Sequence, residues 1–506
     1  MQIDYSSQAH YALVLLPEII LSISAMVILL VDVFQKGEHS RPSSEVIPWL
    51  TIGAVLLAAV ANTYLLGLQS TDPAATIALD SFRVFSNYLF LLAAGLFVLI
   101  STRYVDQEHL RLGELYVLVL FATVGMMVFA GAQDLMVIFL GLEVMSVPVY
   151  VLTGINRRDQ RSSEGALKYF LLGAFSSAFF LFGIALVYGG AGTTNLPLIA
   201  AAAGVDGLGA SSLLGIGIAL LAVGFGFKVA AVPFHMWTPD AYEGAPTPIT
   251  AFMAAGVKAA AFAAFLRVFL TAFPGLYDTW DSIAIWLAIL TMIGANLVAL
   301  VEGNVKRMLA YSSIAHAGYL LVALAAASTL GAASFLFYLV VYTLMTIGSF
   351  AVVMVVARHG ETRLDLDAYS GLGWQRPFLG VVMTIFLLSL AGFPFTGGFI
   401  GKVFILRAAV EKGLILLAVV LVLASLLSYY YYLRVAWYMW FREATREEQA
   451  ESAAAGPLVM SGGVKTTLAF AAVAVILLGV LPGELLEAAE RSAASLFQLP
   501  GLLGAR

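Results

Sequence analysis

The segment Gly224–Pro248 reads GFGFKVAAVPFHMWTPDAYEGAPTP, and it governs how the rest of the chain is interpreted. Its apolar run carries one lysine, Lys228, and reaches Pro233 five residues later. Proline interrupts a helix because it lacks a backbone N–H and clashes with the preceding turn. In a lipid bilayer the break and the charge both cost free energy, because no water is present to bind the freed backbone groups or the ammonium. Whether those costs apply depends on whether the chain lies in a membrane.

Composition identifies an integral membrane protein. Hydrophobic residues make up 61% of the 506 residues and charged residues only 11%, so the apolar surface cannot all be hidden in a water-soluble core. The net charge of −5 indicates neither a nucleic-acid partner nor another polyanion. The chain has no cysteine, which excludes disulfides, iron–sulfur clusters and thiolate metal sites. We therefore expect no metal or redox cofactor in this chain, and any linked redox chemistry must take place in another one.

Apolar runs long enough to span a membrane recur along the whole chain. A hydrocarbon core of roughly 30 Å takes roughly 20 helical residues, and about fourteen runs satisfy that length. No soluble domain fits between them, so residues 1–506 are predicted to form a single all-α transmembrane bundle. The predicted spans are centred near Ser22, Leu57, Ala93, Ala122, Met145, Phe179, Leu221, Ala260, Leu290, Leu320, Val341, Ile400, Ser425 and Val475.

The distribution of basic residues predicts the orientation. Loops after odd-numbered spans hold most of the lysines and arginines, for example Arg157, Arg158 and Arg161. Loops after even-numbered spans are nearly free of basic residues, and TDPAATIALD and AASTLGAAS contain none. Because basic loops stay in the cytoplasm, both termini are expected on the non-cytoplasmic side. Residues 441–465 are predicted to form a connector on the cytoplasmic side.

Two of the predicted spans are broken. One break lies around Pro233, and the other lies around Pro394 in SLAGFPFTGGFIGKVFIL, Ser389–Leu406. Irregular backbone at membrane depth is tolerated only where protein or water surrounds it, and broken helices in corresponding places indicate a transport site. The lysines fall on opposite sides of the two breaks, so the internal repeat is a weak signal.

Four ionisable residues at membrane depth are the primary candidates for function. They are one acid, Glu143, and three bases, Lys228, Lys258 and Lys402. An amine removed from water loses stabilisation of its charged form, and a nearby carboxylate restores it. If Glu143 lies beside Lys228, approach of the pair favours proton uptake by the lysine and separation favours release. Three lysines joined by water would form a lateral proton relay.

Other polar residues allow two interpretations each. His316, in AYSSIAHAGYLL, either passes protons or is a neutral histidine bonded to Ser312. Asp240 and Glu243 either cap the helix near Pro248 or form a proton-collecting mouth, and capping is favoured. Lys306 and His235 are candidate accessory residues. The tyrosines near Tyr430 are expected to serve packing and an interfacial belt. Snorkelling or lipid contact is expected for the bases nearer to span ends, namely Lys168, Arg267, Lys306, Arg407 and Arg434.

Several long motifs resemble one known family. GLEVMSVPVY, GALKYFLLGAFSSAFFLFGIAL, FKVAAVPFHMWTPDAYEGAPTP, NVKRMLAYSSIAHAGY and GFPFTGGFIGKVFIL are similar to the antiporter-like membrane subunits of respiratory complex I, the proton-pumping NADH:quinone oxidoreductase. The resemblance covers nearly the whole chain. WTPD, MLAYSSIAHAGY and lysine at position 402 resemble the N-type subunits in particular.

The resemblance implies a fold and roles for matching residues. It implies fourteen helices with two inverted five-helix repeats, 108–273 and 280–440, whose seventh and twelfth helices are discontinuous. Glu143 would be the partner of Lys228, Lys258 the central relay, Lys402 the terminal lysine, and His316 part of the hydrated axis between the last two. Flavin and iron–sulfur clusters would lie in partner subunits, M-type and K-type subunits would be neighbours, and the location would be the bacterial inner membrane.

Three other functions stay open from the sequence. The D-type component of a Mrp-type cation/proton antiporter shares the fold, the acid–lysine pair and the terminal lysine. A stand-alone secondary transporter for a small solute would need a central pocket of converging polar groups, whereas the polar residues here are spaced like a relay. A purely structural scaffold would bear the cost of buried charge without a compensating role.

Overall fold

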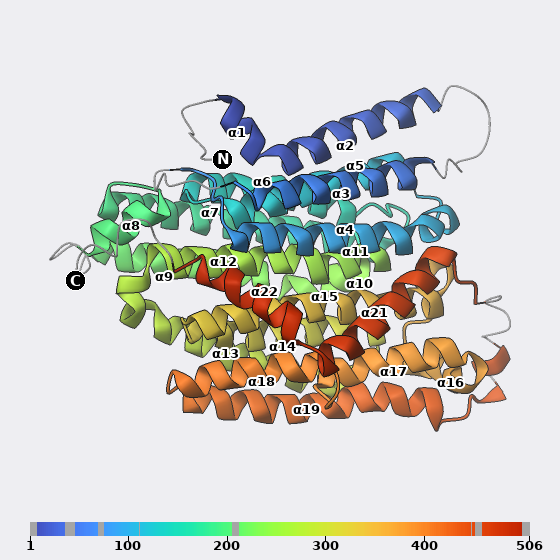
Figure 1. Cartoon of the computed structure of the whole chain (residues 1–506). Helices are drawn as coiled ribbons and strands as arrows, with labels where there is room; N and C mark the ends of the chain where they lie inside the picture. Colours follow the sequence, from blue (N-terminus) through green and yellow to red (C-terminus); the bar gives the residue numbers. More distant parts are fainter. Residues whose placement is uncertain are drawn as a thin grey trace.

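The computed structural model describes residues 8–35, 46–68, 75–110, 112–204, 212–446, 448–450 and 458–497. Within these ranges nearly every residue is helical, and the helices run side by side in one bundle (Figure 1). The helices are α1 (Gln8–Val14), α2 (Leu16–Gln35), α3 (Val46–Leu65), α4 (Ser81–Gln107), α5 (Leu112–Gly131), α6 (Leu135–Thr153), α7 (Gln160–Ala191), α8 (Leu196–Ala203), α9 (Ser212–Val229), α10 (Trp237–Gly244), α11 (Thr247–Phe252), α12 (Lys258–Ala272), α13 (Tyr277–Val301), α14 (Val305–Ala325), α15 (Thr329–Ala357), α16 (Leu372–Gln375), α17 (Pro377–Ala391), α18 (Gly397–Glu411), α19 (Ile415–Trp440), α21 (Gly462–Val480) and α22 (Gly483–Ala494).

The predicted multi-pass membrane fold is confirmed. Thirteen helical segments in the described ranges are long and apolar enough to cross a membrane. The remaining predicted span, near Ile400, is divided between two shorter helices, α17 and α18. Helix α21 begins at Gly462, so the end of the predicted 441–465 connector belongs to a helix. Residues 451–457 of that connector lie outside the described residues.

Short polar side chains fix where several spans begin. Asp80 accepts a hydrogen bond from Arg83 N at the start of α4, and Asp134 accepts from Met136 N at the start of α6. Asp159, Asn304 and other N-cap residues make the same contact before α7 and α14. Such caps satisfy backbone N–H groups that have no partner inside the helix. The sequence therefore sets the helix starts locally, at the ends of the apolar runs.

Small residues allow the closest helix pairs to approach. On α5, a Cβ added at Gly125 would lie 2.2 Å from the backbone N of Met145 on α6. In return, a Cβ added at Gly141 on α6 would lie 2.5 Å from the backbone N of Phe129 on α5. Glycines on both helices thus bring the two backbones together, which is how membrane helices associate without a hydrophobic driving force.

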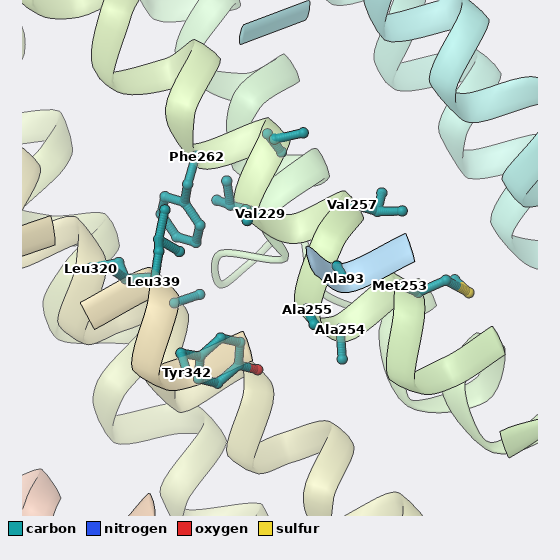
Figure 2. Packing of buried hydrophobic residues seen from close by; sticks show 14 of the residues in the cluster. Ala93, Val229, Met253, Ala254, Ala255, Val257, Phe262, Leu320, Leu339 and Tyr342 are labelled. Carbon is teal, nitrogen blue, oxygen red and sulfur yellow. The ribbon is translucent and has the colours of Figure 1, made fainter. Parts of the chain in front are cut away.

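The centre of the bundle is the continuous helix formed by α11, a π-helical turn and α12. It lies between α2–α4 on one side and α17–α19 on the other (Figure 1). The π turn, Met253–Val257, ends directly before Lys258, and every residue of α12 is buried. Figure 2 shows Met253, Ala254, Ala255 and Val257 of this turn pointing in different directions into the surrounding core. π turns occur mostly as single-turn bulges, frequently at functional sites.

Both predicted breaks interrupt the helices. Helix α9 ends at Val229 and α10 begins at Trp237, while α17 ends at Ala391 and α18 begins at Gly397. Each break contains a non-glycine residue in the left-handed region, Ala230 with φ 62° and Phe395 with φ 68°. Such backbone conformations cost free energy and persist only where the surroundings impose them. The inverted-repeat relation between 108–273 and 280–440 stays a prediction.

Candidate functional site

Lys228 lies in the last turn of α9, directly before the first break, and is 4% exposed. Its Nζ donates to Ser146 Oγ at 2.8 Å and to Tyr150 OH at 3.0 Å, and both acceptors belong to α6. The ammonium also lies 5.3 Å from the centroid of the Tyr150 ring. A cation at the carboxyl end of a helix is stabilised by the helix dipole, so the break itself favours a charge at this point.

Glu143 lies three residues before Ser146 on α6 and is partly buried. Its carboxylate accepts a hydrogen bond from Ser177 Oγ of α7 at 2.6 Å. The ion pair with Lys228 that the resemblance implies is not formed in this conformation, because the Lys228 ammonium donates hydrogen bonds to Ser146 and Tyr150 instead. Glu143 and Lys228 are therefore both bound to α6–α7 hydroxyl groups in one small region, with separate partners.

Lys258, the first residue of α12, is 2% exposed and entirely enclosed by protein. Its Nζ donates to the carbonyl oxygen of Ser313 at 2.9 Å and also to the Ser313 hydroxyl. Tyr342 of α15 donates to that same hydroxyl at 2.8 Å. Lys258 is thereby connected through one serine of α14 to a tyrosine of α15, and Figure 2 shows the Tyr342 side chain beside the central helix.

His316 of α14 is bonded on both sides of its ring. The Nδ1 atom pairs with Tyr338 OH at 2.6 Å and the Nε2 atom with Tyr432 OH at 3.1 Å. The Tyr432 hydroxyl also contacts Ser312, so the expected histidine–serine contact exists only through this tyrosine. The sequence places Tyr432 in the tyrosine run expected to serve packing. In the structure it is fully buried and belongs to the polar axis.

Lys402 lies on α18 but reaches back across the second break. Its Nζ donates to the carbonyl oxygens of Leu390 and Ala391, at 2.9 Å each, which are the last residues of α17. These carbonyls have no partner inside a helix that ends there. The ammonium also lies 4.7 Å from the ring centroid of Tyr319. Lys228 and Lys402, on opposite sides of their breaks in sequence, thus both occupy the carboxyl end of a half-helix.

The polar groups form one nearly continuous axis from Lys258 to Lys402. The Tyr342 and His316 rings lie 5.2 Å apart, and the His316 and Tyr319 rings 5.3 Å apart, so the axis runs from lysine to lysine through tyrosines and one histidine. Between Lys228 and Lys258 the described side chains are joined by contacts between aromatic rings, one pair stacked and two pairs edge to face. The rings lie on α6, α7 and α10, and they are Tyr150, Tyr169, Trp237 and Tyr242.

The predicted accessory acids are held in ion pairs. Asp240 binds Lys168 at 2.7 Å and Arg307 at 3.0 Å, and Glu243 binds Arg307 at 2.7 Å. Burial raises the pKa of Asp240, but its bonds to Lys168 and Arg307 lower it by more, so the net shift is downward. Helix α11 begins after Pro246 without a side-chain cap. The capping prediction is therefore wrong, because both acids point to cations instead of the helix start.

His235 lies in the first break and is only half-buried. Burial lowers its pKa, and a hydrogen bond with the Pro233 backbone partly offsets that effect. None of the contacts described for the lysine axis includes this histidine.

Two of the bases expected to snorkel are fully buried instead. Lys306 is 0% exposed and donates to Glu361 at 2.6 Å and to Ala245 O at 2.6 Å. Arg267 is 1% exposed and binds Asp80 through two hydrogen bonds of 2.7 and 2.9 Å. Snorkelling is wrong for both, because an acid distant in sequence neutralises each charge inside the protein.

The other three bases stay close to the surface or bind backbone. The side chain of Lys168 is 44% exposed, and that of Arg407 is 61% exposed and paired with Glu411. Arg434 donates to the carbonyl oxygens of Leu300 and Glu302 at the end of α13. That contact satisfies carbonyls that the end of the helix leaves free.

Glu361 is a buried ion-pair residue that the sequence does not reveal. It lies in a polar loop, HGETR, after α15, where the sequence indicates only a surface turn. In the structure it also accepts from Tyr104 OH at 2.6 Å and from Thr247 N at 2.7 Å. It therefore joins α4, α11 and α14 through one carboxylate. In the described ranges no three His, Asp or Glu side chains are placed to hold a metal ion.

The fold and the site together define a class of protein: a multi-pass helical bundle with two interrupted helices and buried lysines that contact serine and tyrosine side chains. The family model described as NADH:quinone oxidoreductase/Mrp antiporter, TM matches residues 132–428. A relative from Trichlorobacter lovleyi, NADH-quinone oxidoreductase subunit N, is 47% identical over 479 residues, covering 95% of this chain and 96% of the relative. The chain belongs to the NADH-quinone oxidoreductase subunit N family.

Solved structures agree with this assignment. A chain of respiratory complex I from Thermus thermophilus with bound aureothin is 34% identical with a TM-score of 0.76, over 94% of this chain and all of that one. A chain of the Mrp complex from Dietzia has a TM-score of 0.82 over 97% of this chain and 98% of its own length. At 22% identity the second likeness shows the common fold alone.

Proposed function

We propose that this chain is a proton-translocating membrane subunit of an NADH:quinone oxidoreductase. Protons pass through Lys228, Lys258, His316 and Lys402, with Glu143 adjusting the charge of Lys228. One observation carries the proposal: three lysines and a histidine, each at most 6% exposed, lie in the bundle interior among serine and tyrosine side chains. Buried ionisable groups of this kind are expensive in a membrane and mark ion or proton paths.

The contacts support transfer over short steps. Lysine, serine, tyrosine and histidine side chains each carry a proton that a neighbour can accept, and the axis from Lys258 to Tyr342 already has every hydrogen bond in place. Between Lys228 and Lys258, water must supply the missing links. A shift of Glu143 from Ser177 towards Lys228 would favour the charged lysine, and its return would favour release.

We also propose where the chain lies and which subunits adjoin it, on the basis of the family. The chain is expected to lie in the bacterial inner membrane with both termini on the non-cytoplasmic side, beside M-type and K-type subunits. Flavin and iron–sulfur clusters would be bound by other subunits, where electrons pass from NADH to quinone. In this assembly the chain acts as part of a translocase, and conformational and electrostatic signals from its neighbours drive the proton steps.

The test is a lysine replacement in the assembled complex. Lys228→Met is compared with Lys465→Met, which removes an exposed lysine from α21. Proton uptake into vesicles and NADH:quinone electron transfer are measured in the same preparation. Loss of proton uptake with slowed electron transfer is expected for Lys228→Met alone, with assembly intact. Unchanged uptake would contradict the proposal.

A Mrp-type cation/proton antiporter is the second candidate, because the Dietzia structure has the same fold. The two are separated by driving the vesicles with a sodium gradient in the absence of NADH. An antiporter moves protons under that condition, whereas a component of an NADH-driven pump does so only when electrons flow.

A further inference from the structure

Two surface cavities meet at the end of the bundle where α4 ends and α5 begins. Each has a volume of about 360 Å³. Arg103, Tyr104, Gln107, Arg358 and His359 are among the residues lining the first, and Glu108, Glu114, Tyr150, Arg157 and Arg158 are among those lining the second. His109 lines both, so it stands at the point where the cavities adjoin.

Titratable side chains cluster at this junction. The Glu108 carboxylate accepts from Gly360 N at 2.8 Å and contacts His359 Nδ1 at 3.1 Å. The His109 and His359 rings lie 6.5 Å apart. The Glu108 side chain is only 6% exposed, whereas that of His359 is 70% exposed. A carboxylate below the surface is therefore joined to an imidazole that reaches into solvent, and histidine is the side-chain type whose charge changes near neutral pH.

The second cavity leads to the lysine axis. Tyr150 lines this cavity, is 8% exposed, and accepts the hydrogen bond from Lys228 at 3.0 Å. Of the lysines on the axis, Lys228 is the one whose direct hydrogen-bond partner lines a described cavity. Asp240 and Glu243, for which a proton-collecting mouth is the less favoured alternative from the sequence, are paired with Lys168 and Arg307.

We propose that Glu108, His109 and His359 form the proton-collecting mouth of this protein, and that the second cavity and Tyr150 deliver the protons to Lys228. The proposal rests on the proposed function. When the Lys228 amine is neutral, the Tyr150 hydroxyl gives its proton to Nζ and takes another from a water molecule in the cavity. One N–H bond and one O–H bond form as two O–H bonds break. The hydroxide left behind takes a proton from the mouth.

The charges around the mouth fit this role. Arg103, Arg157 and Arg158 are exposed at the rims, where water screens them. Arg358 faces the first cavity, and Glu108 and Glu114 are the carboxylates of the second. The acids that can hold a proton thus lie on the side that contains Tyr150.

The experiment uses the whole complex in vesicles and measures proton uptake against pH. The triple variant Glu108→Gln, His109→Gln, His359→Gln is compared with Tyr150→Phe. The matched control is Asp159→Asn, which removes a carboxylate outside both cavities while keeping the N-cap of α7. Near pH 8 the triple variant is expected to lose uptake roughly tenfold or more, because positioned proton carriers contribute about 10²-fold or more to transfer rates.

Added buffer separates the mouth from the path behind it. Imidazole in the medium should restore uptake in the triple variant, since a mobile carrier can replace the lost groups, but it should not restore Tyr150→Phe. A triple variant with normal uptake at every pH overturns the proposal, and so does rescue by anionic lipid instead of imidazole, which would make the cavity a headgroup site. If the Lys228→Met variant still takes up protons, the proposed function is wrong. If Lys228→Met abolishes proton uptake and the triple variant takes up protons normally, only the proposed proton-collecting mouth is wrong.

Discussion

Replacing Glu361 by glutamine should destabilise the protein strongly. Lys306 is 0% exposed and its partner side chain only 10%, so the substitution leaves a positive charge buried without a counter-charge. Removing one partner of a buried ion pair costs about 3–5 kcal/mol, because the other charge keeps its desolvation penalty. Tyr104 and Thr247 N also lose a charged acceptor. The loss should appear in the thermal unfolding of the detergent-solubilised complex.

A double-mutant cycle tests the cause of that loss. Lys306→Met combined with Glu361→Gln removes both charges and should recover most of the stability. The control is Glu411→Gln, which breaks the exposed Arg407–Glu411 pair and should change stability by no more than about 1 kcal/mol. If Glu361→Gln is as stable as the parent, or if the double variant is worse than both singles, the reasoning is refuted.

The Lys306–Glu361 ion pair also makes the stability of the protein depend on pH in the acid range. Burial raises the pKa of Glu361, but Lys306 and the hydrogen bonds from Tyr104 and Thr247 lower it by more, so its pKa in the folded protein lies below the ordinary 4.5. A folded-state pKa below the unfolded one means that the pair stabilises fully above about pH 4.5. The contribution is lost as the pH falls through the lower folded value. Glu361→Gln should therefore remove part of the acid dependence of unfolding.

Three further predictions concern packing, ion pairing and the relay. Gly125→Ala should destabilise the protein by about 1–3 kcal/mol, because the added Cβ clashes with the Met145 backbone. Gly53→Ala is the control, because a Cβ added there has no packing neighbour within 4 Å, and thermal unfolding compares the two variants. Arg267→Lys keeps the charge but loses the two-bond contact with Asp80, and unfolding should show a loss of about 1.5–3 kcal/mol. Tyr432→Phe removes the contacts with Ser312 and His316 and should reduce proton uptake more strongly than Tyr431→Phe, which removes the bond to Asn296; equal effects would refute a relay role for Tyr432.

Local features of the sequence predicted most of the fold. Span length follows from the run of apolar residues, and Pro233 and Pro394 each fall within a break. The buried state of Lys228, Lys258 and Lys402 was also predictable, because each lies within an apolar run of the sequence. These inferences depend only on residues that lie close together in the sequence.

Pairings between distant residues could not be predicted in this way. Glu361 meets Lys306 across 55 positions, and Tyr432 meets His316 across 116, so nothing local marks either contact. Arg267 lies near the end of an apolar run, where the sequence indicates snorkelling, and its partner Asp80 lies 187 positions away. The partner of Glu143 was missed for a related reason: a serine in an apolar helix gives no sign of which acid it will bind.

The π turn before Lys258 has a consequence for comparing chains of different length. Each residue of an α-helix turns the chain by about 100°. A relative with one residue fewer within Met253–Val257 could close the turn into ordinary α-helix without breaking it. Because the wider π turn takes up one extra residue, the residues of α12 would keep nearly their present directions, and the amine of Lys258 would stay beside Ser313. A single-residue gap at this point in an alignment is thus compatible with a lysine on the axis, whereas a single-residue gap within the regular helix α12 would turn all later residues by about 100°.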